Sequence, residues 1–224
     1  MGSYRVGFVI PALNEEDTVG AVVRGLNGRG VIIVVDDGSS DNTALCASNA
    51  GAHVVRHVAS RGYEGALNTG IETAFVSHGV DGVITLDADG EHDLSSVDEF
   101  VRALQGQKYA LVLGARDRKN RVVEKLAGLI FLVRYGVRDI FCGMKGYQAY
   151  VWKARQVFDS TQSVGTELAL CCLRARLPFC EVKVRSPKRL GPSKYGARSI
   201  LANLRMLGGI LRALRIKPIN TDLH

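Results

Sequence analysis

The sequence has no run of about 18 uninterrupted apolar residues, which is the length that a membrane-spanning helix requires. Its first residues lack the apolar stretch of a signal peptide, so we expect no cleaved leader. No internal repeat or low-complexity segment is visible in the 224 residues. Because 46% of the residues are hydrophobic, the chain can bury one large core.

Cysteine is scarce, and no regular spacing relates its five positions. No CxxC pair and no Cys/His pattern with metal-ligand spacing occurs. An odd number of cysteines also argues against a complete disulfide framework. We interpret them as reduced, mostly buried thiols of a cytoplasmic protein.

Acidic residues are absent from Val182 to Pro218, although this segment is rich in Lys and Arg and the net charge of the chain is +7. Such a basic segment suits a phosphorylated ligand, an anionic membrane surface or a nucleic acid. Few aromatic residues accompany it and no nucleic-acid-binding motif occurs, so we expect no nucleic-acid partner.

Strand and helix patterns alternate four times in the first half of the chain, with short connections. This alternation predicts an α/β fold with a doubly wound, mostly parallel sheet flanked by helices. The predicted strands lie at residues 6–10, 31–35, 54–55 and 83–86, and predicted helices at residues 14–26 and 43–50. A glycine-rich turn at residues 61–66 is predicted to lead into a third helix, which ends near residues 78–79.

The second half is less regular. A predicted long helix at residues 197–215 has leucines and isoleucines at helical spacing and arginines on another face. This pattern is typical of a basic amphipathic helix on an anionic bilayer; a helix packed on the domain or at a dimer contact is the alternative. The other predicted helices lie at residues 97–104, 122–134 and 166–175, the strands at 110–113 and 179–184, and a loop followed by a strand at 139–150.

Two aspartates follow the predicted strand at residues 83–86. Asp87 and Asp89 point the same way in an extended chain, and Glu91 continues the spacing. Carboxylates are hard oxygen ligands that suit Mg²⁺ or Mn²⁺, which usually keeps positions open for substrate phosphates. The small Ala88 and Gly90 leave room for a large polyanion. The alternative is a turn whose acids cap a helix.

Acidic residues also follow two other predicted strands, at residues 11–15 and 36–37. Ligands of open α/β sheets bind outside the carboxyl ends of the strands. Acids gathered there repel one another unless a cation or a hydrogen-bond donor joins them. A metal-bound nucleotide would resolve this conflict, so we expect the three stretches to meet in one crevice.

Several short motifs occur along nearly the whole chain, and each alone is weak. They are residues 10–16 (IPALNEE), 34–43 (VVDDGSSDNT), 60–67 (SRGYEGAL), 87–92 (DADGEH), 114–116 (GAR), 139–146 (DIFCGMKG), Glu167 and 189–194 (RLGPSK). Together, and in this order, they resemble a family-2 glycosyltransferase with the GT-A (nucleotide-diphospho-sugar transferase) fold. The similarity is greatest to the dolichyl-phosphate mannosyltransferase-like branch, which charges polyprenyl phosphates.

The resemblance implies a nucleotide-diphosphate sugar as donor, either GDP-mannose or a UDP-hexose. The first two motifs would hold the base and ribose, and the DADGEH motif would hold the sugar diphosphate with Mg²⁺ or Mn²⁺. The donor-binding residues implied are Pro11, Ala12, Asn14, Glu15, Asp36, Asp37, Gly38, Ser39, Gly65, Asp87, Ala88 and Asp89, and the metal ligands implied are Asp87, Asp89 and Glu91.

The resemblance also implies inverting transfer of a hexose to a polyprenyl (dolichyl or undecaprenyl) phosphate. Asp89 and Arg116 would be catalytic, with Arg116 neutralising the departing diphosphate. A phosphate acceptor is already ionised, whereas a sugar hydroxyl would need a general base, Asp139 or Glu167. The acceptor-binding residues implied are Arg116, Arg134, Asp139, Lys145, Arg189, Ser193 and Lys194.

The sequence departs from the family pattern in several places. Leu13 replaces a frequent aromatic residue, Ser60 a frequent Asn, and Asp93–Leu94 the usual proline after the His. Lys145 stands where an aromatic residue or Arg is common. The first and last of these departures leave the choice of base and of acceptor open.

We expect residues 1–196 to form the catalytic domain and residues 197–224 the amphipathic helix and tail, with the protein peripheral on the cytoplasmic face of the membrane and able to form oligomers. One alternative is a soluble family-2 transferase with a glycan or protein hydroxyl acceptor. Others are a non-catalytic sugar-nucleotide-binding domain and a sugar-nucleotidyltransferase. The acidic first loop disfavours the last of these.

A few aromatic and histidine residues have simpler interpretations. We expect His53, His57 and His78 at surface or loop positions and Trp152 in the core. Tyr63 either stacks near the donor or packs internally.

Overall fold

The computed structural model describes residues 3–90, 94–117, 122–163, 165–185, 208–209 and 211–219. The strands are β1 (Val6–Ala12), β2 (Val31–Asp36), β3 (His53–Arg56), β4 (Gly82–Thr85), β5 (Leu111–Arg116), β6 (Lys145–Gln148) and β7 (Phe179–Val184). The α-helices are α1 (Val19–Leu26), α2 (Thr43–Asn49), α3 (Gly62–Glu72), α4 (Val97–Gln105), α5 (Val122–Tyr135), α6 (Ala149–Lys153) and α7 (Glu167–Arg174).

The described strands form one seven-stranded sheet in the order β3-β2-β1-β4-β6-β5-β7. The described strands pair in parallel except for β6, which runs antiparallel to β4 and β5. The predicted doubly wound, mostly parallel sheet is therefore confirmed. In this order β1 lies between β2 and β4, so the first four strands end at a common edge.

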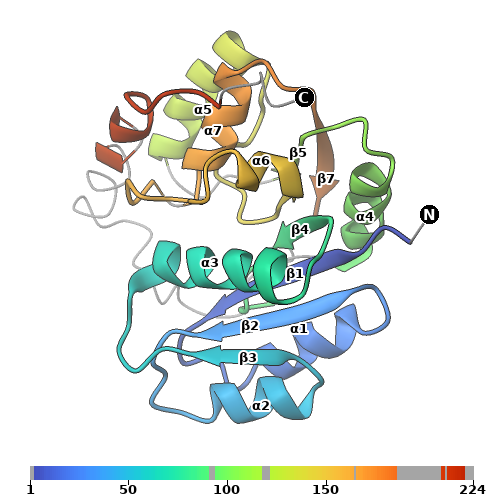
Figure 1. Cartoon of the computed structure of the whole chain (residues 1–224). Coiled ribbons are helices and arrows are strands. Elements are labelled where there is room, and N and C mark those ends of the chain that lie inside the picture. Colours follow the sequence, from blue (N-terminus) through green and yellow to red (C-terminus); the bar gives the residue numbers. More distant parts are fainter. Residues whose placement is uncertain are drawn as a thin grey trace.

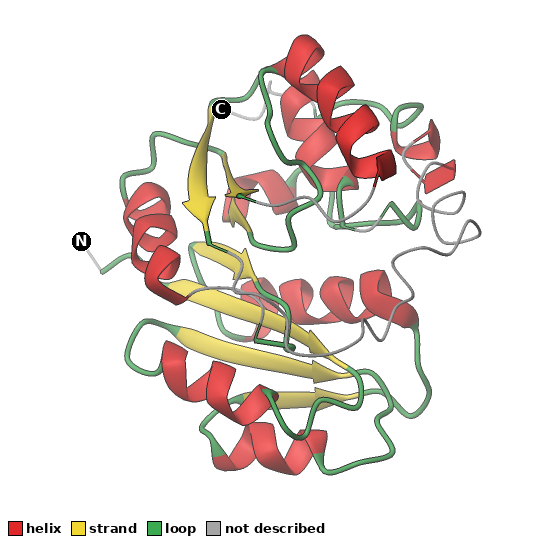
Figure 2. Ribbon diagram, turned by 180° about the vertical axis from the view of Figure 1, so that it is seen from behind, coloured by secondary structure: helices red, strands yellow, loops and turns green. Residues whose placement is uncertain are grey.

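Helices cover both faces of the sheet (Figures 1 and 2). The core on one face includes residues of α1, α2 and α4, and the core on the other includes residues of α3, α5, α6 and α7. All seven residues of β1 are buried because both faces of this strand are covered. Trp152 belongs to the second core, as predicted.

The first helix starts later than predicted. Residues 14–18 form a turn, and α1 begins at Val19. The amides of Glu15 and Glu16 donate hydrogen bonds to Thr43 and Asp41 in the loop after β2. Tertiary hydrogen bonds thus replace the first helical turn that the acidic residues indicated.

The third predicted helix also starts at a different residue, because α3 begins at Gly62, within the predicted glycine-rich turn. The helical segment has two parts. It consists of α3 followed by a π-helical turn at Thr73–Ser77. The short helix α6 was not predicted.

The C-terminal prediction lies mostly outside the described residues, as does the boundary predicted at residue 196. In the described part, Ala213 and Ile219 are buried in the core, and the Arg212 guanidinium donates to the Thr161 carbonyl at 2.8 Å. Leu211 and Leu214 are exposed. This short part of the segment therefore packs on the domain.

Within the described part of the chain, none of the helices has both the length and the apolar character that crossing a bilayer would require.

Gly70 packs α3 closely against the sheet and generates a stability prediction. A Cβ at this position would lie 2.4 Å from Val9 Cγ1 and 3.0 Å from Val35 Cγ2, both in the core. Replacing Gly70 with Ala should therefore lower the free energy of unfolding by about 1–2 kcal/mol in urea titrations, because overpacking outweighs the gain in helix propensity. The exposed Ser48→Ala on α2 is the control, and equal stability of the two variants would contradict this packing.

Candidate active site

The strand order brings the acidic stretches to one edge of the sheet. β2, β1 and β4 are parallel neighbours, so their carboxyl ends lie side by side (Figure 1). The strands end at Asp36, Ala12 and Thr85, and Asp87 follows two residues after β4. The three stretches therefore follow neighbouring parallel strands, as predicted.

Hydrogen bonds join the loop after β1 to the loop after β2. The Asn14 amide donates to Ser39 Oγ at 2.9 Å, and Asn14 Oδ1 accepts from the Ser40 amide at 3.0 Å. The Glu15 amide donates to Thr43 Oγ1 at 2.8 Å. Asn14 has a φ of 54°, which Asn tolerates better than most residues with a Cβ. Hydrogen bonds thus connect the loops that contain Asn14, Glu15 and Ser39, three of the predicted donor-binding residues.

Asp36 is fully buried at the end of β2. Its Oδ1 accepts a hydrogen bond from the Ser39 amide at 2.8 Å, and its Oδ2 lies 3.2 Å from Arg56 Nε. The second contact is an ion pair without hydrogen-bond geometry. Arg56 was not predicted as a site residue, although it ends β3 at the same edge of the sheet. Its position at the carboxyl end of a strand is the signal that could have identified it, because ligands of open α/β sheets bind at such ends.

Asp37 links β2 to the start of α3. Its carboxylate accepts hydrogen bonds from Ser60 Oγ at 2.6 Å, His57 Nδ1 at 2.6 Å and the amides of Arg61 and Gly62 at 2.8 and 2.9 Å. Burial alone raises the pKa of Asp37, but these donors outweigh it and hold the pKa below its ordinary value of 3.8. The side chain therefore ties two loops together.

His57 lies in the loop after β3, within the predicted choice of surface or loop, but its side chain is buried rather than at the surface. It is 5% exposed, and its Nε2 lies 3.0 Å from Thr69 Oγ1 on α3, opposite the contact to Asp37. Its burial follows from these two polar partners, which the local sequence does not reveal. His53 is exposed and His78 is half-buried.

Gly38 allows the loop after β2 to pass close to Ser60. Its φ is 82°, and a Cβ there would lie 3.1 Å from the Ser60 amide nitrogen. Glycine fits this position because it has neither the steric penalty nor the extra atom.

Asp87 lies between α3 and the loop before β6. The Tyr63 hydroxyl donates to Asp87 Oδ1 at 2.9 Å. Gly143 lies against the carboxylate, and a Cβ there would come within 2.3 Å of Asp87 Oδ2. Burial, and then the charge of Asp87, raise the pKa of Tyr63, so its phenol stays protonated as a donor. Tyr63 therefore contacts the site directly as well as packing against the core.

Asp87 and Asp89 are half-buried, and Ala88 between them is buried. The two carboxylates offer hard oxygen ligands, and the glycine at position 143 lets the Asp87 carboxylate pack against the backbone at a distance that any side chain would prevent. These features fit part of a divalent-cation ligand set. No group of three His, Cys, Asp or Glu suited to a metal occurs among the described residues, and Glu91, the predicted third ligand, lies outside them.

Arg116 and Asp139 form a two-point ion pair at the end of β5. Arg116 Nε lies 2.7 Å from Asp139 Oδ2 and its Nη2 lies 3.1 Å from Oδ1. Lys145 is buried at the start of β6, and its Nζ donates to the Cys142 carbonyl at 2.7 Å. Burial lowers the pKa of Lys145, and the charges of Asp139 and Asp87 oppose this. Lys145 thus compensates both carboxylates from between β4 and β5.

The other predicted site residues have the following places in the structure. Pro11 and Ala12 are buried in β1. Gly65 lies in the first turns of α3, where a Cβ would come within 2.6 Å of the Arg61 Cβ. Arg134 is exposed near the end of α5. Three predicted acceptor-binding residues lie outside the described residues: Arg189, Ser193 and Lys194.

The hydrogen bonds of Asp37 generate a pH-dependent stability prediction. Asp37→Asn should lower the free energy of unfolding by about 2–3 kcal/mol at pH 7, because a charged acceptor is lost. The pKa of Asp37 is lowered in the folded state, so its contribution is full above the unfolded value of 3.8 and disappears as the pH falls through the folded value.

The difference between wild type and Asp37→Asn should therefore shrink below about pH 4 in denaturant titrations at a series of pH values. The exposed Asp17→Asn variant is the matched control and should stay within about 0.5 kcal/mol of wild type. A difference for Asp37→Asn that is unchanged down to about pH 3 would contradict the assignment.

The chain is similar in sequence to known proteins. Residues 8–158 match the family model of glycosyl transferase family 2. The UDP-N-acetylglucosamine–dolichyl-phosphate N-acetylglucosaminyltransferase of Methanococcus voltae is 25% identical over 83% of this chain and 87% of its own length. The undecaprenyl-phosphate 4-deoxy-4-formamido-L-arabinose transferase of Pseudomonas paraeruginosa is 30% identical over 88% of this chain and 62% of its own length.

A solved structure shows the same fold. Glucosyl-3-phosphoglycerate synthase from Mycobacterium tuberculosis, in complex with Mn²⁺, uridine diphosphate and phosphoglyceric acid, superposes with a TM-score of 0.66 at 21% identity, over 91% of this chain and 78% of that chain. The matches to three curated relatives span 58%, 62% and 87% of their lengths. These findings confirm the predicted resemblance. Because the family model covers residues 8–158 of 224, this chain belongs to glycosyl transferase family 2 and is a glycosyltransferase with the GT-A fold.

Proposed function

We propose that this glycosyltransferase moves a hexose from GDP-mannose or a UDP-hexose to a polyprenyl phosphate, such as a dolichyl or undecaprenyl phosphate, with inversion at the anomeric carbon. The proposal rests on the burial and the ion pairs of Asp139 and Glu167, the two carboxylates suggested as general bases for a hydroxyl acceptor. Both are buried and held by arginine, so an acceptor that arrives already ionised suits the site better than a hydroxyl.

Asp139 is the first of these carboxylates. It is 1% exposed, and Arg116 binds both of its oxygens. A general base must reach the acceptor proton and take it up. Both oxygens of Asp139 already accept hydrogen bonds from the Arg116 guanidinium, so the carboxylate is not directed at an acceptor hydroxyl. Asp139 therefore serves to fix the Arg116 guanidinium in one orientation.

Glu167 is the second. It is fully buried at the start of α7, forms an ion pair with Arg155 and accepts a hydrogen bond from the Ser160 amide at 2.7 Å. Ser160 Oγ lies 3.1 Å from both carboxylate oxygens. Glu167 thus anchors the loop before α7, away from solvent.

The donor would lie along the strand ends. The linked loops after β1 and β2, with Asn14, Glu15 and Ser39, would border the base and ribose. Asp36 would hold the loop after β2 through its hydrogen bond from the Ser39 amide. Asp87 and Asp89, with Glu91, would hold Mg²⁺ or Mn²⁺ beside the sugar diphosphate. When bound, such a cation neutralises negative charge on a diphosphate leaving group. Mn²⁺ and uridine diphosphate in the Mycobacterium tuberculosis synthase support this arrangement.

Arg116 would stabilise the charge that develops as the diphosphate departs. Its pairing with Asp139 fixes the planar guanidinium before substrate arrives, which is how a cation contributes most in a catalytic site. A phosphate acceptor would need positioning rather than deprotonation. The basic Arg189 and Lys194, with Ser193, remain the proposed contacts for it, and the names of the dolichyl- and undecaprenyl-phosphate relatives support the acceptor class.

A peripheral position on the cytoplasmic face of a membrane accords with such an acceptor. In α5, Phe131 is buried whereas Leu129, Ile130 and Val133 are 60%, 67% and 81% exposed. These exposed apolar side chains offer a surface for lipid.

A soluble phosphorylated acceptor is the second candidate. Phosphoglyceric acid in the similar Mycobacterium tuberculosis structure favours it. It carries a hydroxyl as well as a phosphate, so the two candidates differ in the group that is glycosylated.

Direct assay separates the acceptors. The protein should convert a nucleotide sugar and a polyprenyl phosphate in detergent, with Mg²⁺ or Mn²⁺, to a glycolipid detected by mass. A panel of GDP- and UDP-sugars gives the donor, and phosphoglyceric acid replaces the lipid in a parallel series. Product only with the hydroxyl acceptor would sink the lipid-phosphate assignment.

The DADGEH motif gives a second test. Asp89→Asn should lower the turnover number by about a hundredfold or more, because one charged group near the diphosphate is lost. It should also weaken metal-dependent binding of the nucleoside diphosphate in calorimetry. The exposed Asp98→Asn on α4 makes the same charge change and should leave both quantities unaltered. Normal turnover by the Asp89 variant would exclude a catalytic role for this residue.

A further inference from the structure

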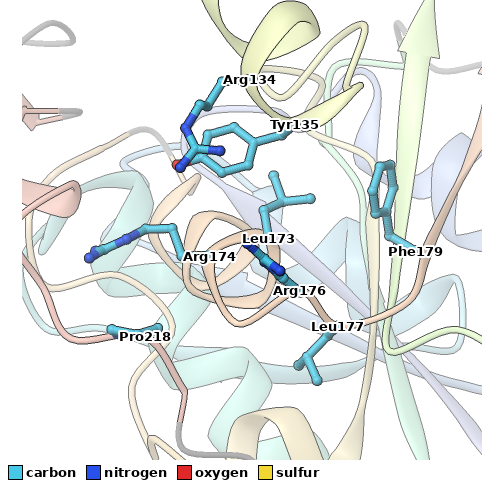
Figure 3. Close-up of a pocket in the computed structure, with 8 residues that line it drawn as sticks. All are labelled: Arg134, Tyr135, Leu173, Arg174, Arg176, Leu177, Phe179 and Pro218. Carbon is cyan, nitrogen blue, oxygen red and sulfur yellow. The ribbon is translucent and has the colours of Figure 1, made fainter.

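A cavity of about 470 Å³ lies where the ends of α5 and α7 meet the start of β7 (Figure 3). It is separate from the candidate active site. Phe179, in its wall, pairs with Leu111, whereas Arg116 pairs with Val184, five residues further along. At about 3.3 Å per residue, this places the cavity roughly 16 Å from the end of β5.

Three arginines line the cavity: Arg134 near the end of α5, Arg174 at the end of α7 and Arg176 just after it. The described residues of the lining include no Asp or Glu. None of the three forms an ion pair with a described carboxylate. Like charges gathered in this way disfavour one another unless an anion joins them.

The side chains of Arg134 and Arg174 contact neighbouring groups, whereas Arg176 is exposed and is placed by its backbone conformation. The Arg134 guanidinium lies 5.2 Å from the centre of the Tyr135 ring, and Figure 3 shows the two side chains next to each other. Arg174 donates a hydrogen bond to the Ile216 carbonyl. Arg176 has a φ of 56°, which ends α7 and lets the Leu177 amide bond back to the Cys172 carbonyl at 3.1 Å.

The rest of the wall is apolar or aromatic. Tyr135, Leu177 and Phe179 are half-buried beside the arginines, and Leu173 closes the cavity from α7. Such a site suits an anion with an apolar or aromatic substituent. The guanidinium groups can bind the anion, and the apolar wall can contact the substituent.

We propose that this cavity is a second anion-binding site, which takes a phosphate ester with an apolar or aromatic substituent and is distinct from the reaction centre. The same chemistry is available from a soluble phosphate ester and from the headgroup of an anionic lipid. The exposed apolar residues of α5 just before Arg134 are the reason to test the lipid source.

The test uses two probes and two double variants of the whole chain. Phenyl phosphate is the soluble probe, measured by calorimetry. Vesicles of phosphatidylcholine, with or without phosphatidic acid, are the lipid probe, measured by flotation. Arg134→Gln/Arg176→Gln removes two cations from the cavity. Arg24→Gln/Arg102→Gln removes two exposed cations from α1 and α4, which lie on the other face of the sheet, and is the matched control.

The cavity variant should bind phenyl phosphate at least about tenfold more weakly than the control, because charge-assisted hydrogen bonds are lost. A loss confined to vesicles with phosphatidic acid supports the same site with a lipid headgroup as its ligand. The proposal is overturned if the two double variants bind phenyl phosphate equally and also bind the phosphatidic acid vesicles equally. It is also overturned if the wild type binds neither probe. Arg134→Gln alone changes one exposed side chain and serves if the double variant unfolds. None of these measurements depends on glycosyl transfer, so failure of the proposed reaction would be recognised separately.

Discussion

Compensation of buried negative charge governs this molecule. Parallel strands end together, and their loops bring carboxylates into a small region where none can be left without partners. Asp36 pairs with Arg56, Asp37 receives four hydrogen bonds, and Asp139 is held by Arg116. Each partner comes from a distant part of the chain, so the charges also tie the loops to one another.

The same compensation separates two kinds of acid at the sheet edge. Asp36, Asp37 and Asp139 are at most 4% exposed and have partners within the protein, whereas Asp87 and Asp89 are half-buried. The conformation of Asp87 is set by the Tyr63 hydroxyl on one side and the absent side chain of Gly143 on the other. A carboxylate held in one orientation in this way is what a site for a metal and a diphosphate requires.

The antiparallel strand β6 joins the acidic part of the site to its basic part. Lys145 opens this strand between Thr85 of β4 and Leu113 of β5. Its buried ammonium is fixed by the Cys142 carbonyl and lies within the electrostatic influence of Asp87, Asp139 and Arg116. A substitution at this position would therefore disturb both ends of the site. In contrast, the arginines of the cavity near β7 belong to a separate electrostatic environment.

The sequence by itself determined the fold class, the strand positions and the acidic stretches, because buried strands and turn residues leave local patterns of period and composition. It also placed Asp87 and Asp89 just after a strand, because the apolar run that precedes them is a local pattern. The sequence did not reveal that His57 is buried against Asp37 or that Arg116 pairs with Asp139. It also did not reveal that Arg134 lines the cavity between α5, α7 and β7. These facts depend on contacts between residues 20 or more positions apart, and local patterns do not encode such contacts.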